Sequence, residues 1–171
     1  MNHLALTVQA FERLGLRGDG TQKMLDVGCR YDYMKKYFTD RGFEWNGSDM
    51  KPLSSGITEC KMECMPMYQD ESFDLIWVCH AFEHCERPVD AMREFKRLLK
   101  PTGTLFISTP MHCEHQVLRA DSDHIMVLTG MQLIRLGDYA GFKKVAQLNE
   151  WNEGGQDEAA SSLITVFKKD G

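Results

Sequence analysis

Two acidic residues and one glycine near the start of the chain have the types and spacing of a cofactor-binding site. Asp26 and Gly28 belong to the stretch LDVGCRYDYMKKYF at residues 25–38, and Asp49 follows Gly28 after roughly 20 residues. In α/β proteins, a strand that passes into a helix through a glycine often holds a nucleotide-like cofactor, and an acid at this spacing binds the ribose hydroxyls. Asp49 is therefore predicted to bind a ribose; the alternative is that it caps the turn that follows its strand.

The position of Asp26 indicates the charge of the cofactor. A dinucleotide places its anionic pyrophosphate at the first turn, where an acid just before the glycine would repel it. The ammonium group of an amino acid would instead be attracted. Asp26 and Asp49 together therefore favour an aminoacyl nucleoside, and a nicotinamide-dependent oxidoreductase is disfavoured.

Several histidines could transfer a proton or bind a metal ion. His84 and His112 are the predicted catalytic residues, because an imidazole can act as a general base, although His84 could equally be structural and His112, like His115, an exposed loop residue. His80 and His84 have the four-residue spacing of some zinc sites. His80 is expected at a strand end, however, and not on one helix with His84, so no metal site is predicted. His124 is expected to be structural.

The elements that must position these residues alternate between strands and helices. This alternation predicts an α/β fold, a Rossmann-like doubly wound sheet of about seven strands. The final two strands are joined by a loop without a helix, so the sheet should be mostly parallel with an antiparallel last strand. Ligands bind beyond the carboxyl ends of such strands, where Asp26, Asp49 and His80 fall. Strands are predicted at residues 23–27, 43–49, 56–62, 73–79, 104–109, 143–151 and 162–169, and helices at residues 4–11, 33–42, 87–101 and 129–142.

Composition limits the class of protein. The 171 residues suit one domain, residues 1–171, with an N-terminal helix and turn at 1–20 and an α/β core at 21–171. The net charge is −5 and the basic residues lie at helical spacing among acids and aliphatics, so no nucleic-acid partner is expected. A homodimer is compatible with the small size.

The location is expected to be cytoplasmic. No apolar run is long enough to cross a bilayer, and the N-terminus lacks the pattern of a secretory signal, so no membrane association is expected. The six cysteines include no CxxC pair, and some fall inside apolar strands. Reduced thiols are therefore predicted, in place of disulfides or a metal centre.

The order of several motifs resembles a known family. LDVGC at residues 25–29 and GSD at 47–49 are followed by a long block at 62–110, which contains FEHCERP and REFKRLLKPTG, and by DHIMVLT at 123–129. Together they resemble the class I S-adenosylmethionine-dependent methyltransferases, in particular the small-molecule (type 11-like) branch. The resemblance extends over about residues 24–145, and the middle block is its most specific part.

The resemblance implies a role for each matching residue. Asp26 would lie near the methionyl ammonium, Gly28 would let the backbone approach the cofactor, and Asp49 would hold the ribose. His80 would pass beneath the methionyl group. The remaining residues implied to bind S-adenosylmethionine are Cys29 and Arg30 in the glycine loop, and Met50, Met62 and Glu63 around the adenine.

Three positions depart from the family pattern. Arg30 and Asp32 stand where small residues are usual, and Lys61 replaces an acid before the pair that contacts the adenine. Bulky residues restrict the backbone conformations that glycine allows. Asp32 could cap the following helix, but its charge would repel the methionyl carboxylate unless Arg30 neutralises it.

Two functions remain open at this level. The first is an S-adenosylmethionine-dependent methyltransferase that transfers the methyl group in line to a small-molecule acceptor and releases S-adenosylhomocysteine. The second is a catalytically degenerate protein of the same fold that serves as a binding or scaffolding module. The acceptor, and whether O, N, C or S is methylated, cannot be read from the residues.

Overall fold

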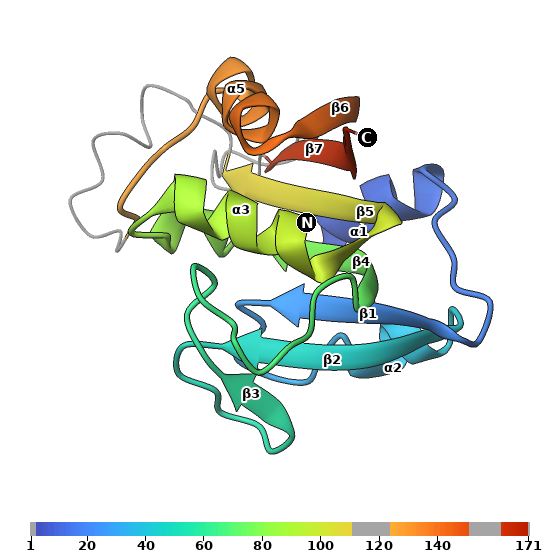
Figure 1. The fold of residues 1–171 in the computed structure, drawn as a ribbon. Helices are drawn as coiled ribbons and strands as arrows, with labels where there is room; N and C mark the ends of the chain where they lie inside the picture. Colours follow the sequence, from blue (N-terminus) through green and yellow to red (C-terminus); the bar gives the residue numbers. More distant parts are fainter. Residues whose placement is uncertain (1–2, 111–123, 151–161, 171) are drawn as a thin grey trace.

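A single mixed sheet forms the centre of the computed structural model, which describes residues 3–110, 124–150 and 162–170. The strand order is β3-β2-β1-β4-β5-β7-β6 (Figure 1). The strands are β1 (Gln22–Val27), β2 (Phe43–Asp49), β3 (Ile57–Glu59), β4 (Phe73–Cys79), β5 (Leu99–Pro110), β6 (Phe142–Glu150) and β7 (Ser162–Lys169). The helices are α1 (His3–Arg13), α2 (Lys35–Thr39), the 3-10 helix η1 (Phe82–His84), α3 (Pro88–Leu98) and α5 (Gly130–Ala140).

The direction of the strands confirms the predicted fold class. Strands β1 to β5 pair in parallel with one another, whereas β7 is antiparallel to both β5 and β6. β1 lies between β2 and β4, and Asp26 pairs with Gly47 on one side and Trp77 on the other. The carboxyl ends of β1, β2 and β4 therefore meet at one edge of the sheet.

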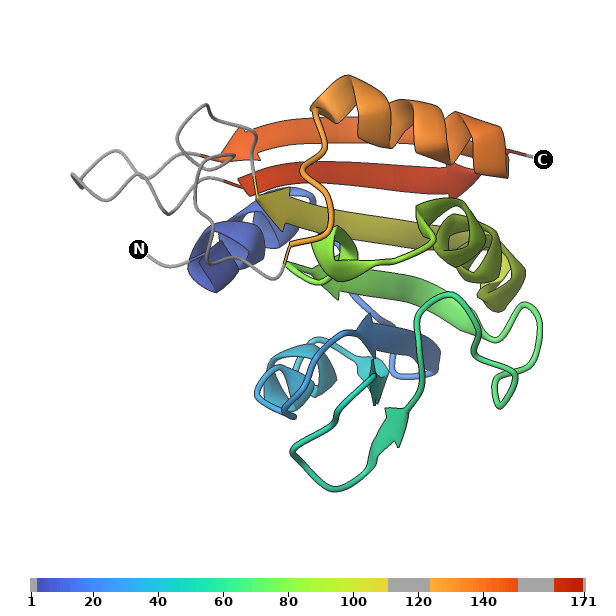
Figure 2. The same cartoon turned by 90° about the vertical axis from the view of Figure 1, so that its left-hand side faces the viewer.

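The helices cover the two faces of the sheet (Figure 2). Along β1 and β4 the side chains alternate: Leu25 and Ile76 enter the core shared with α3 and α5, whereas Met24 and Trp77 enter the core shared with α1 and α2. Strands that bury both faces have few polar positions, which explains the almost continuous apolar sequence of β4. Within the described residues, no helix has the length and apolar character needed to cross a membrane.

The largest difference from the predicted elements is in the segment after β1. The helix expected at residues 33–42 is only α2, Lys35–Thr39, and its N-cap is Met34 without a side-chain hydrogen bond. The suggested capping role of Asp32 is therefore wrong: its backbone carbonyl accepts from the Lys35 N–H, and its backbone N–H donates to the Ser54 hydroxyl. The loop between β1 and α2 is therefore longer than the helical pattern of the sequence predicts.

Other elements follow the sequence closely. β2 and β4 have the predicted bounds, and Thr129 forms a capping box with Gln132 at the start of α5. β3 is shorter than predicted, and β5 begins earlier, at Leu99. His112 and His115 lie outside the described residues.

Candidate cofactor and active site

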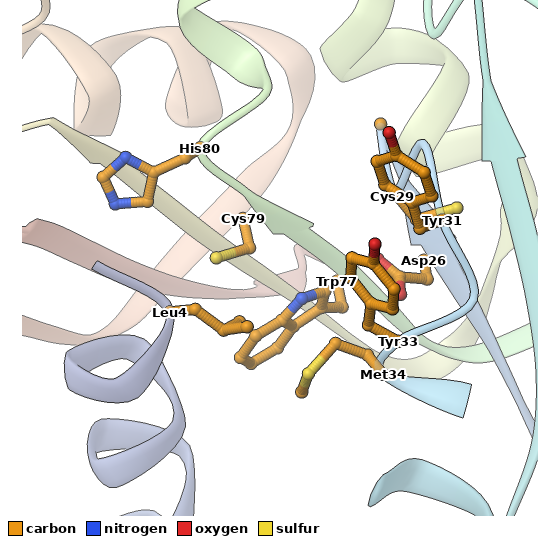
Figure 3. Close-up of a pocket in the computed structure, with 10 residues that line it drawn as sticks. Leu4, Asp26, Cys29, Tyr31, Tyr33, Met34, Trp77, Cys79 and His80 are labelled. Atoms are coloured by element: carbon orange, nitrogen blue, oxygen red, sulfur yellow. The ribbon is translucent and has the colours of Figure 1, made fainter. Parts of the chain in front are cut away.

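A pocket of about 360 Å³ opens at the carboxyl ends of β1 and β4, beside the N-terminal end of α1 (Figure 3). Its position is the one expected for ligands in a sheet of this topology. The residues that line it are Leu4, Asp26, Gly28, Cys29, Tyr31, Tyr33, Met34, Trp77, Cys79 and His80. The site predicted from the sequence therefore contributes Asp26, Gly28, Cys29 and His80 to one cavity.

Among the described residues that line this pocket, Asp26 is the one carboxylate. Its side chain is 3% exposed, and the Trp45 indole Nε1 donates a hydrogen bond of 3.2 Å to its Oδ2. Burial disfavours the charged form and raises the pKa of Asp26 to about 7, with a smaller contribution from the negative charge of Asp49. A positively charged group in the pocket would reverse this effect, so the carboxylate is suited to bind a cation.

Gly28 is required by its backbone and by its neighbour. Its φ is +72°, and a Cβ at this position would lie 2.3 Å from the Cβ of Ala81, which follows β4. Any side chain here would force the loops after β1 and β4 apart. Gly28 therefore has a packing role. Its predicted close approach to a cofactor remains a prediction.

Arg30 takes the backbone conformation expected of the missing second glycine of the loop. Arg30 adopts φ +52°, a left-handed conformation that is normally the property of glycine. The Arg30 N–H donates to Asp49 Oδ2 at 2.9 Å, and its carbonyl accepts from the Leu53 N–H at 2.8 Å. At position 30 the loop thus has a glycine-like backbone conformation although the residue is an arginine.

Asp49 ties this loop to β2. Besides the bond from Arg30, its Oδ1 accepts from the Lys51 N–H at 2.7 Å. Each carboxylate oxygen has a second lone pair, so both could still accept from ribose hydroxyls. These two hydrogen bonds orient Asp49 at the end of β2. Its contact with a ribose stays a prediction.

The residues predicted around the adenine have different surroundings. Met50 is half exposed beside Asp49, whereas Met62 packs against the core under α3. The Glu63 Oε1 accepts from the backbone N–H groups of Glu86 and Arg87 at 3.1 and 3.3 Å. Glu63 therefore has a structural role at the start of α3, and its contact with an adenine stays a prediction.

His80 lies at the opposite side of the pocket from Asp26 in Figure 3. Like Arg30 it is left-handed, with φ +49°. Its Nε2 is 2.9 Å from the Ser162 Oγ, and its Nδ1 is 3.7 Å from the Glu83 carboxylate. A nearby residue of η1 and a distant residue of β7 therefore fix the imidazole at the end of β4.

His84 does not line the pocket. Its ring lies on η1, edge-on to the ring of His124 at 5.0 Å. The ligand atoms of Glu83, His84 and His124 all lie within 4.8 Å of one another, a spacing compatible with a metal ion. This group differs from the pair considered in the sequence, His80 and His84, because His124 comes from a distant segment. The catalytic role of His84 remains a prediction.

Cys29 and Cys79 contribute sulfur atoms to the pocket wall. Burial raises the pKa of both thiols, so they stay protonated and behave as small apolar groups. No disulfide joins the five cysteines that the structure describes, all of which are free.

Sequence reasoning missed the aromatic part of the pocket. Tyr31 and Tyr33 flank Asp32 in the loop, and their rings are stacked with centroids 4.7 Å apart and an interplanar angle of 12°. The sequence places Tyr33 at the start of the predicted helix 33–42 and Tyr31 just before it. Only the loop conformation brings both of them to the pocket with Leu4 and Trp77.

Comparison with known proteins supports the same class. Residues 25–107 match the family model described as "Methyltransferase domain". A ubiquinone biosynthesis O-methyltransferase of Pseudomonas fluorescens Pf-5 is 27% identical over 161 residues, which cover 82% of this chain and 65% of that protein. The chain therefore spans slightly less than two thirds of the length of this relative.

Solved structures share the fold at low sequence identity. A Haloferax volcanii protein proposed to be a methyltransferase, in complex with the Trm112 methyltransferase activator, superposes with a TM-score of 0.81 at 17% identity, over 99% of this chain and 91% of that one. The Burkholderia thailandensis 1,6-didemethyltoxoflavin-N1-methyltransferase, with its substrate and S-adenosylhomocysteine bound, gives 0.73 at 16%, over 98% and 77%.

The fold defined by these comparisons is that of the class I methyltransferases. The matched residues 25–107 make up slightly less than half of the chain, and they match a model of methyltransferase domains. The resemblance of its sequence motifs to this family is thereby confirmed.

Proposed function

We propose that this protein is an active S-adenosylmethionine-dependent methyltransferase that methylates a small-molecule acceptor. The observation that carries the proposal is the buried Asp26 carboxylate in a pocket at the ends of β1 and β4, with Asp49 fixed at the end of β2. A carboxylate at the first turn suits an ammonium and opposes a pyrophosphate. The donor set therefore fits S-adenosylmethionine better than a dinucleotide.

Each residue has a role in this proposal. Asp26 binds the methionyl ammonium and Asp49 the ribose hydroxyls, while the adenine lies against Met50, near Met62 and Glu63. Gly28, Cys29 and Arg30 form the loop beneath the cofactor. His80 supports the methionyl end, and His84 or His112 accepts a proton where the acceptor needs a base.

Little covalent chemistry is required of the chain itself. When bound, S-adenosylmethionine supplies a methyl group on a sulfonium, which a nucleophile can displace in line. The residues of the pocket hold this group in one orientation and exclude water from it, which accounts for a large part of the rate of such reactions. A small acceptor is supported by the names of the curated relatives and by the Burkholderia neighbour. A cytoplasmic location and a homodimer belong to the same proposal.

The alternative is a protein of this fold that has lost activity. It is favoured by the replacement of small residues by Arg30 and Asp32. The left-handed Arg30 argues against it, because the backbone of the loop has kept a glycine-like conformation despite the substitution.

Isothermal titration calorimetry with S-adenosylmethionine and S-adenosylhomocysteine tests the proposal. We expect binding of both ligands at micromolar concentrations. No heat at high micromolar ligand, from a protein whose circular dichroism shows it to be folded, would rule out the methyltransferase. Binding without transfer of labelled methyl to any of a set of phenol, amine and thiol acceptors would favour the inactive alternative.

A further inference from the structure

The composition of the pocket wall indicates the charge of the group it encloses. Among the described residues that line the pocket there is one carboxylate, Asp26, one imidazole, that of His80, and neither lysine nor arginine. Three of the lining side chains are aromatic: Tyr31, Tyr33 and Trp77. Aromatic faces carry negative electrostatic potential and attract cations that have lost part of their water. The wall as a whole therefore favours a positively charged, largely apolar group.

The two tyrosines are stacked on each other, and one of them is largely exposed. Tyr33 is 73% exposed although it is a large aromatic side chain, and its ring is stacked on Tyr31. In Figure 3 both rings lie on the same side of the pocket as Asp26. Both rings line the pocket, so the exposed Tyr33 side chain is accessible to a ligand while the Tyr31 ring is stacked against it.

The proposed cofactor carries two cations of different chemistry. Its ammonium has N–H donors and can bind a carboxylate such as Asp26 directly. Its sulfonium has no N–H or O–H and cannot be recognised in this way. Faces of aromatic rings and nearby negative charge are the groups that can stabilise it, as they do for quaternary ammonium ligands.

We propose that Tyr33, supported by the stacked ring of Tyr31, selects the sulfonium of S-adenosylmethionine and so makes this protein bind the methyl donor more tightly than S-adenosylhomocysteine. This inference rests on the proposed function. The product lacks the positive charge, because the methyl group leaves with the bond to sulfur broken and its electron pair retained by sulfur. The contribution of the ring is therefore lost at the moment of transfer, which favours release of the product.

The test compares two ligands in three variants. Tyr33→Leu removes the aromatic face but keeps an apolar side chain, Tyr33→Phe keeps the face and loses the hydroxyl, and Tyr139→Leu changes another exposed tyrosine, on α5, as a matched control. By calorimetry, Tyr33→Leu should weaken S-adenosylmethionine about 2- to 30-fold, the range expected of a cation–π contact, and leave S-adenosylhomocysteine within about twofold. Tyr33→Phe and Tyr139→Leu should resemble the unmodified protein with both ligands.

Equal losses for both ligands in Tyr33→Leu would overturn the inference, since they would show only general packing, and so would unchanged binding of both. If the unmodified protein binds neither ligand, the proposed function fails, and the preference of Tyr33 for a cation is then tested by a second experiment. Trimethylsulfonium and its neutral counterpart, dimethyl sulfide, are then titrated while the ring signals of Tyr33 are followed by NMR. A shift specific to trimethylsulfonium supports the cation site, and no shift or an equal shift with both refutes it.

Discussion

The loops after β1 and after β4 form the two sides of the pocket, and they are held in place by different means. Each contains a non-glycine residue in the left-handed conformation, Arg30 in one and His80 in the other. The loop after β1 is fixed mainly through its backbone: the N–H groups of Gly28 and Cys29 both donate to the Ser48 carbonyl. The loop after β4 has a backbone bond as well, from the His80 N–H to the Ser108 carbonyl, but here side chains add to it, since His80 contacts both Ser162 and Glu83.

This difference explains which sequence changes each loop tolerates. The hydrogen bonds that hold Arg30 use its backbone N–H and carbonyl and not its own side chain, so Arg30 can replace a glycine at a cost of about 1–2 kcal/mol. A conformation held by an imidazole and a carboxylate depends on both residues. Five predictions test this comparison.

The largest effect is expected where the two loops touch. Gly28→Ala places a Cβ 2.3 Å from that of Ala81 and also strains a left-handed backbone, so it should destabilise the protein by about 2–4 kcal/mol. Chemical denaturation measures the loss. Gly20→Ala is the control, because Gly20 is also left-handed but has nothing within 4 Å of the added Cβ. Equal losses in both variants would show that the contact with Ala81 is unimportant.

Removal of the carboxylate that joins the first loop to β2 should come next. Asp49→Ala deletes the acceptor for Arg30 and Lys51 and the predicted ribose ligand, so affinity for S-adenosylmethionine should fall about 100-fold, or roughly 2.7 kcal/mol. Calorimetry gives the value, and Asp138→Ala on the exposed side of α5 is the control. Full affinity in Asp49→Ala would refute the ribose assignment.

The buried acid of the first loop should make binding depend on pH. Because the pKa of Asp26 is raised to about 7, its carboxylate is mostly protonated at pH 6 and mostly charged at pH 8. Affinity for the cationic cofactor should therefore rise about tenfold between these values. Asp26→Asn should bind weakly and without this pH dependence, as measured by calorimetry in buffers of matched ionic strength.

The same shift has the opposite consequence for the stability of the unliganded protein. The folded chain retains the Asp26 proton up to about pH 7, whereas an unfolded chain loses it at lower pH, so this residue lowers stability as the pH rises toward 7. Asp26→Asn should remove that contribution. An unchanged pH profile of unfolding in Asp26→Asn would contradict the raised pKa.

The smallest effects distinguish the two left-handed residues directly. Arg30→Gly relieves strain and keeps the backbone bonds, so its stability should be within about 1 kcal/mol of the unmodified protein. His80→Gly relieves the same strain but deletes the contact with Ser162, and should cost about 1–2 kcal/mol. Thermal denaturation compares the pair; a larger loss in Arg30→Gly than in His80→Gly would reverse the proposed difference between the loops.

The amino-acid sequence by itself determined the fold class and the edge of the sheet where the pocket lies. Apolar runs such as β4, the alternation of strands and helices, and the helix-free final loop are local patterns, and each follows from which faces an element must bury. Asp26 and Gly28, which line the pocket, were predicted at this edge because a cofactor turn requires specific residue types at a fixed spacing, and their cofactor contacts, like that of Asp49, stay predictions.

Only the tertiary structure decided how the two sides of the pocket are completed. The left-handed backbone of Arg30 depends on acceptors and donors in and after β2, and the positions of His80 and His124 depend on contacts with β7 and η1. The stacked tyrosines lie in the loop between β1 and α2, which extends into the start of the predicted helix. Contacts between residues far apart in the chain leave no periodic signal, because they arise when the sheet brings the ends of separate strands together.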